Sequence, residues 1–73
     1  MLRPDTVDDI AVEFVEKKKK VTGVNIVAKE HKNDIWIVKG TCPIDLGGHP
    51  WTESFEVVID RKGRIKASSF KLI

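Results

Sequence analysis

Hydrophobic residues near the start of the chain recur at the spacing of an amphipathic helix. They fall at i, i+3, i+4, i+7 and i+8 and form one stripe, which consists of Val7, Ile10, Ala11, Phe14 and Val15. Pro4 followed by Asp5 or Thr6 is typical of a helix start, and Gly23 is typical of the residue after a helix end. The pattern predicts a helix over about 6–22.

Hydrophobic and polar residues alternate after Val24, which predicts strands rather than a second helix. Turn signals at 32–34 and 61–63 join neighbouring strands into two hairpins. The segment 43–50 contains two prolines and a glycine pair, and we interpret it as a loop that cannot belong to a central strand. The expected strands cover approximately 24–31, 35–42, 51–60 and 64–72.

These elements predict one α+β domain over residues 1–73, in which the N-terminal helix packs on a four-stranded antiparallel meander sheet. Asp60 is expected to pair with Arg64 across the last turn, with Gly63 in a left-handed conformation. Regular alternation then places Phe55 opposite Ser69. The helix-facing side of the first two strands is expected to contain Val24, Ile26, Ala28, Trp36 and Val38.

The same alternation sends a second set of large hydrophobic side chains to the sheet face turned away from the helix. This set consists of Val27, Ile35, Ile37, Val58, Phe70 and Leu72. A solvated sheet face is usually polar, and so many large apolar side chains exceed what a small monomer normally exposes. We therefore expect this face to bind a second copy of the chain or another protein, with a twofold homodimer as the simplest arrangement.

The length and the cysteine count favour the same conclusion. A chain of 73 residues buries a limited core, and small domains often gain stability from disulfides, metals or self-association. Cys42 is the only cysteine, which excludes an intrachain disulfide. The first residues contain no apolar run of the kind that a signal peptide needs, and no stretch has the length of a membrane span. We expect a cytoplasmic protein without membrane contact.

Cys42, Asp45 and His49 lie close together in the sequence and raise the question of a nucleophile with its base, or of a metal site. Their spacing matches no metal signature, a fourth ligand is lacking unless His31 folds across, and no oxyanion hole is evident. We interpret Cys42 as a small half-buried residue at a strand end and His49 as a solvated loop residue. The sequence thus predicts no enzyme, no metal and no cofactor.

The lysine run at 17–20 suggests an alternative function, that of a small basic nucleic-acid-binding protein. Further basic residues in the strands, and Trp36 and Trp51 as stacking platforms, would extend such a site. Lysines at the C-terminus of a helix, however, also interact favourably with its dipole. The net charge of +2 is too small to require a polyanionic partner.

The order of the motifs provides a resemblance. The helix is followed by two alternating runs separated by a glycine-bearing loop, namely Trp36-x-Val38-x-Gly40 and Phe55-x-Val57-x-Ile59-Asp60-x-x-Gly63-x-Ile65. In this order the chain resembles the small PepSY-type domains and, more broadly, the cystatin-like domains, in which a helix packs on a curled sheet. PepSY-type domains are associated with binding or restraining peptidases, so the resemblance implies a peptidase-restraining role. We expect a non-catalytic interaction module that acts through its exposed sheet face.

Overall fold

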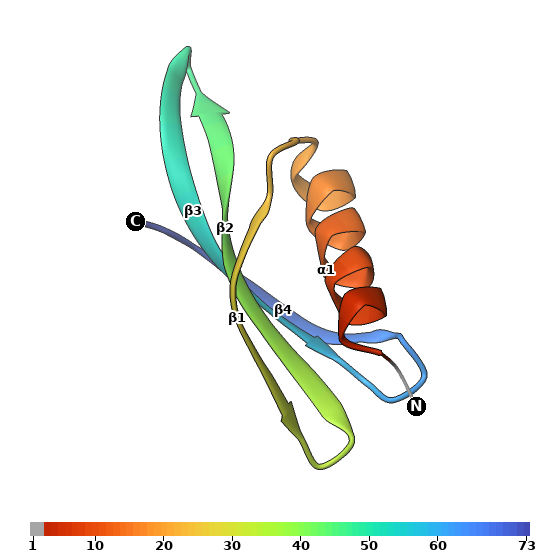
Figure 1. Cartoon of the computed structure of the whole chain (residues 1–73). Helices are drawn as coiled ribbons and strands as arrows, with labels where there is room; N and C mark the ends of the chain where they lie inside the picture. The colour runs from red at the N-terminus through yellow and green to blue at the C-terminus, as the bar shows by residue number, and fades with distance from the viewer. Residues whose placement is uncertain (1–2) are drawn as a thin grey trace.

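The computed structural model describes residues 3–73 and contains one helix and a four-stranded antiparallel sheet. The sheet has the spatial order β1-β2-β3-β4, which is that of a meander (Figure 1). The predicted α+β fold with an N-terminal helix is therefore confirmed. The elements are α1 (Pro4–Lys19), β1 (Asn25–Lys32), β2 (Ile35–Leu46), β3 (His49–Ile59) and β4 (Ile65–Leu72).

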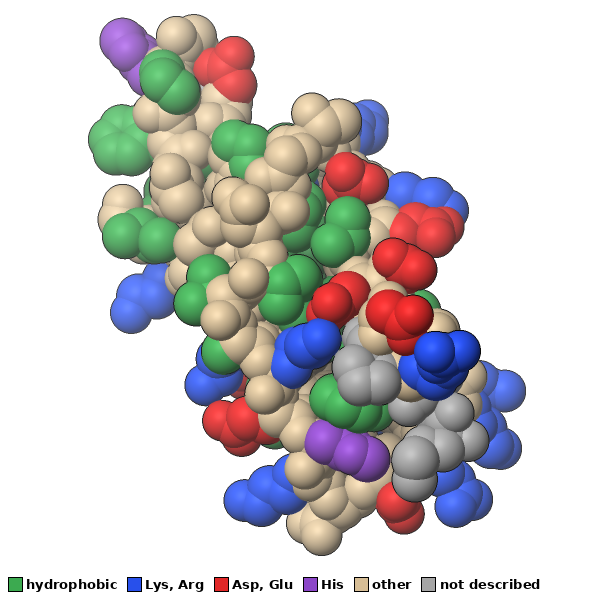
Figure 2. All heavy atoms as spheres, viewed as in Figure 1, with side chains coloured by type: hydrophobic (Ala, Val, Ile, Leu, Met, Phe, Trp, Pro, Cys, Tyr) green, Lys and Arg blue, Asp and Glu red, His purple; other side chains and the backbone are tan. Residues whose placement is uncertain are grey.

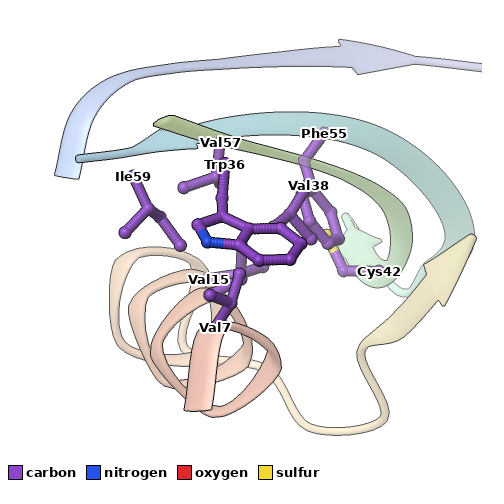
Figure 3. Close-up of a cluster of buried hydrophobic side chains, with 9 residues drawn as sticks. Val7, Val15, Trp36, Val38, Cys42, Phe55, Val57 and Ile59 are labelled. Atoms are coloured by element: carbon purple, nitrogen blue, oxygen red, sulfur yellow. The ribbon is translucent and has the colours of Figure 1, made fainter. Parts of the chain in front are cut away.

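The hydrophobic core lies between α1 and one face of the sheet. Val7, Ala11 and Val15 are fully buried and Ile10 and Phe14 pack at the margin of the core, so the predicted stripe on the helix is confirmed. The indole of Trp36 lies between the helix and the sheet (Figure 3). The sheet contributes five further buried side chains, Val38, Cys42, Phe55, Val57 and Ile59.

Both ends of α1 differ from the predicted range of 6–22. The helix begins at Pro4, whose fixed φ suits the first helical position, and its N-cap residue Arg3 makes no capping side-chain hydrogen bond. It ends at Lys19 because Lys20 turns left-handed, with φ 56° and ψ 47°. The N–H of Val21 donates to the carbonyl of Glu16 and closes this end. The residues after Lys19 therefore leave the helix axis early and run toward the sheet.

The prediction of a loop over 43–50 is wrong. β2 continues through Leu46 and β3 begins at His49, so that Gly47 and Gly48 alone form the turn. Both glycines have positive φ, 61° and 84°, as a two-residue hairpin turn of this kind requires.

The two prolines of this segment fit the ladder because they need no hydrogen bond there. Ile73 donates its N–H to the carbonyl of Thr52, so Thr52 bonds toward β4 and not toward β2. Pro43 is the β2 partner of Thr52, and it therefore occupies a position whose missing N–H costs no ladder bond. Pro50 pairs two positions further along the same ladder and shares this property.

A bulge in β1 changes the expected face of its side chains. The register shifts between Ile26 and Ala28, which makes Val27 an extra residue in the strand. Ala28 then pairs with Lys39, and it lies on the face turned away from the helix, contrary to the prediction. Lys29 moves to the helix side, where its Nζ lies 3.1 Å from Oδ2 of Asp8.

A second bulge lies between the pairs that Val58 and Ile59 form with β4, and it changes the face on which the later side chains of β4 lie. Phe55 lies opposite Phe70 instead of the expected Ser69, and their ring centroids are 6.3 Å apart. Phe70 packs against the core, and Leu72 shares its face by alternation. The prediction that Phe70 and Leu72 lie on the face turned away from the helix is therefore wrong, because one extra residue reverses every later side chain.

The turn between β3 and β4 has the predicted form. Asp60 and Arg64 pair through a backbone bond of 2.9 Å, and Gly63 takes φ +85°. The Asp60 carboxylate also accepts hydrogen bonds from the N–H groups of Arg64 and Lys62, at 2.9 and 2.8 Å. The bond from Arg64 is the main cause that lowers the pKa of Asp60 below its ordinary 3.8; desolvation opposes it, and the Lys62 N–H and the two positive side chains add to it.

Replacing Asp60 with alanine is expected to destabilise the protein at neutral pH and to matter less in acid. A carboxyl group whose pKa is lower in the folded state stabilises that state above its unfolded pKa, and this contribution is lost as the pH falls through the folded pKa. Urea unfolding of wild type and Asp60→Ala at about pH 7 and about pH 2 measures the difference. Asp60→Asn keeps an acceptor oxygen without the charge, so its free energy of unfolding at neutral pH should lie between those of wild type and Asp60→Ala. An equal difference at both pH values would contradict the assignment.

Candidate interaction surface

Cys42, Asp45 and His49 lie along the β2–β3 hairpin without meeting. Cys42 is buried opposite Glu53 on the helix side, whereas Asp45 lies three positions further along, opposite Pro50, on the other face. His49 follows Gly48 at the tip, about 13 Å along the strand from Glu53 at roughly 3.3 Å per residue. Within residues 3–73, no group of three or more His, Cys, Asp or Glu side chains is arranged to hold a metal ion.

The Cys42 thiol is placed in a setting that disfavours its reactive form. Burial raises the pKa of Cys42, the negative charge of Glu53 raises it further, and Lys19 opposes these effects. The thiolate is the nucleophile and the metal ligand, so a raised pKa keeps the group in its inert protonated state at neutral pH.

The distal part of the β2–β3 hairpin, residues 43–46 and 49–52, projects beyond the rest of the sheet and is called the arm here. β1 pairs with β2 only as far as Thr41. β4 ends at Leu72, opposite Glu53, and one further bond joins Ile73 to Thr52. Beyond these pairs the arm has two strands where the sheet has four. Its projection contributes to the elongated shape of the molecule, which measures 41 × 18 × 17 Å (Figure 1). Ile44 and Trp51 pair on the helix side of the arm. Ile44 is half-buried and packs against the core, whereas Trp51 is 49% exposed.

A groove separates the arm from the end of α1. Two adjoining hollows, of about 480 and 400 Å³, share Lys20, Val21, Ile44 and Asp45 and together form what we call the arm groove. Pro43 and Pro50 line its outer part, and Leu72 lines its inner part. Figure 2 shows hydrophobic side chains exposed on the upper half of the molecule, where the arm projects, and many charged side chains over the helix and the lower half.

A partly buried ion pair lies at the inner end of the arm groove. The Nζ of Lys19 is 2.9 Å from Oε1 of Glu53, and the two side chains form an ion pair. The same ammonium lies 4.4 Å from the ring centroid of Phe70, a cation–π distance. This pair connects the C-terminal end of the helix to β3 and fixes one wall of the groove.

The face turned away from the helix carries the remaining four residues of the predicted partner face, Val27, Ile35, Ile37 and Val58. Only Val27 is strongly exposed, at 70%, and the other three are half-buried. A hollow of about 410 Å³ on this face is lined by Val27 together with polar side chains that include Lys39, Glu56 and Lys71. Mixed composition of this kind is ordinary for a solvated antiparallel sheet.

Three of the four lysines at 17–20 have partners within the chain. Lys17 pairs with Glu13 at 2.9 Å, Lys19 pairs with Glu53, and Lys18 lies 6.0 Å from the ring centroid of Phe14. These contacts are those of a solvated helix end. Lys19 and Lys20 both line the arm groove, and Lys17 lines a separate hollow of about 350 Å³ beside α1.

In comparisons with known proteins, no family model, curated protein or solved structure matches this chain. The resemblance to PepSY-type and cystatin-like domains therefore stays a prediction. In the part of the chain that the structure describes, no helix combines the length and the apolar character needed to cross a membrane.

Proposed function

We propose that this chain is a non-catalytic interaction module that binds another protein through the arm groove. The observation that carries this proposal is the distribution of exposed hydrophobic side chains. Of the large hydrophobic side chains whose burial the structure describes, four are exposed, and three of them, Trp51, Leu72 and Ile73, lie at the arm end of the molecule. A concave apolar surface beside such side chains is typical of a binding site.

The separation of Cys42, Asp45 and His49 supports the non-catalytic part of the proposal, because a nucleophile needs its base within hydrogen-bond reach. Trp51 lies beside the groove, as the strand partner of Ile44, rather than in its lining. We expect it to contribute most of the binding energy at the rim, since tryptophan is enriched among the residues that dominate binding energy. A peptidase is the class of partner that the resemblance implies.

The test compares one substitution in the arm with one on the opposite face. The immobilised chain captures partners from a native lysate, and each candidate is then purified and its affinity measured for wild type, Trp51→Ser and Val27→Ser. Both substitutions remove an exposed hydrophobic side chain. The proposal predicts that Trp51→Ser weakens binding by about 2 kcal/mol, roughly 30-fold, while Val27→Ser leaves it unchanged.

Three other outcomes would contradict the proposal. A partner that loses affinity with Val27→Ser and not with Trp51→Ser would assign function to the opposite face. A partner released by nuclease would favour the nucleic-acid alternative. Concentration-dependent sedimentation that Val27→Ser abolishes would favour the homodimer expected from the sequence.

A further inference from the structure

The outer edge of β4 carries backbone groups that no strand in the described part of the chain pairs. Ile73 donates its N–H to the carbonyl of Thr52, which makes 52 and 73 a hydrogen-bonded pair. Hydrogen-bonded pairs alternate with non-bonded pairs along an antiparallel ladder, and β4 runs in register with β3 from 67 to 72. The residues in non-bonded pairs therefore point their N–H and C=O groups outward, and these residues are Ser68, Phe70 and Leu72.

The opposite edge of the sheet, β1, is better protected against a further strand. It contains the bulge at Val27, and the regular part that follows carries Lys29, Glu30 and Lys32. Bulges and charged side chains are the usual means by which proteins protect edge strands from pairing. The regular part of β4 carries a single charge, on Lys71, and no proline. The two edges thus differ in how readily they accept a partner.

The charges near β4 indicate the chemistry of that partner. β4 contains Lys66 and Lys71 and no carboxylate, and the carboxylate of Glu56 lies one strand further in, opposite Ser69. Two copies of the chain joined edge to edge would bring two lysines from each copy together, without a carboxylate in either strand. An acidic segment would instead place negative charges beside these lysines.

We propose that the free edge of β4 accepts an extended segment of the partner as a fifth strand, with acidic and hydrophobic residues in alternation. On the helix side, the hydrophobic side chains of this segment pack against Phe70 and the half-exposed Leu72; on the other side, its carboxylates lie beside Lys71. This inference rests on the proposed function, because Leu72 lines both the arm groove and the β4 edge.

The experiment uses the intact chain and a defined probe. The probe is a blocked peptide of the length of β4 in which valine alternates with glutamate, and its control has lysine in place of every glutamate. Calorimetric titration is expected to show binding of the glutamate peptide and none of the lysine peptide. Charge reversal by Lys71→Glu is expected to reduce binding of the glutamate peptide, since it removes the positive charge beside the added strand.

Ser68→Pro tests the backbone contact directly. The N–H of Ser68 points outward, so proline removes a bond to the added strand and none within the sheet. The affinity for the glutamate peptide should fall about tenfold or more, whereas Ser68→Ala should bind like wild type. Circular dichroism checks that the proline variant is folded; if it is not, the Lys71→Glu comparison still decides the question.

Equal affinity of wild type and folded Ser68→Pro, equal affinity for the two peptides, or no binding by wild type would each overturn strand addition. A captured partner that still depended on Trp51 would in that case leave the proposed function standing. If the affinity of a captured partner were unchanged by Trp51→Ser but lost with Ser68→Pro, the partner would bind at the β4 edge and not at the arm groove.

Discussion

Replacing Gly40 with alanine is expected to remove most of the stability of this domain. Gly40 lies at the centre of the sheet, where a Cβ atom would come 2.0 Å from the carbonyl oxygen of Asn25 and 2.7 Å from Cζ of Phe55. The first contact is with backbone, so β1 would have to move away from β2. Overpacking a core costs about 1–3 kcal/mol, and a backbone clash belongs at the upper end of that range. A domain of this size has only about 3–5 kcal/mol to lose.

Thermal and urea unfolding of Gly40→Ala measure this effect, with Gly47→Asn as the control. Gly47 has a positive φ, a Cβ added there would meet no atom within 4 Å, and asparagine tolerates the left-handed conformation. The control should therefore unfold within about 1 kcal/mol of wild type. A Gly40→Ala variant as stable as wild type would show that β1 does not approach β2 as closely as described.

The second large effect is expected from the ion pair at the arm groove. Lys19→Met should destabilise the protein by about 2 kcal/mol, because it leaves the buried carboxylate of Glu53 without its cation. Breaking a fully buried ion pair costs about 3–5 kcal/mol of folding stability. The expected loss is smaller here because the Lys19 side chain is 28% exposed and solvent screens its charge. The double variant Lys19→Met/Glu53→Leu should recover most of the loss.

Lys17→Met is the matched control for the variants at Lys19 and Glu53. The pair between Lys17 and Glu13 is exposed at both ends and lies on the helix surface, so its removal should change the free energy of unfolding by about 0.5 kcal/mol or less. If the double variant at Lys19 and Glu53 were as unstable as Lys19→Met alone, burial of an uncompensated carboxylate would not be the cause.

Local patterns in the sequence were sufficient for the elements that depend on local physics. The stripe from Val7 to Val15 has helical spacing, and the turn from Asp60 to Arg64 needs a glycine where the backbone is left-handed. Both predictions are confirmed because the residues that decide them lie within a few positions of one another.

The faces of β1 and β4 could not be predicted in the same way. Each contains a bulge of one residue, and neither Val27 nor the start of β4 has a glycine or proline that marks it. The expected partner face consequently included Phe70 and Leu72, which lie on the helix side. A single inserted residue decides the face of all that follow, and the hydrophobic pattern alone does not locate it.

The arm was missed for a different reason. Two prolines normally argue against a strand, but Pro43 and Pro50 occupy positions that need no ladder hydrogen bond. The pair Gly47-Gly48 between alternating residues was a hairpin signal that outweighed them. The arm groove depended further on the early end of α1 at Lys19, since the residues that follow it form one wall.

The proposed partner surface comprises the arm groove and the free edge of β4. Its most direct test is a titration of the isotope-labelled chain with the valine–glutamate peptide, followed by nuclear magnetic resonance at each residue. The largest chemical-shift changes are expected at the amides of Ser68, Phe70 and Leu72, extending to the indole N–H of Trp51. Changes centred on Val27 and its neighbours across the opposite face would contradict this expectation.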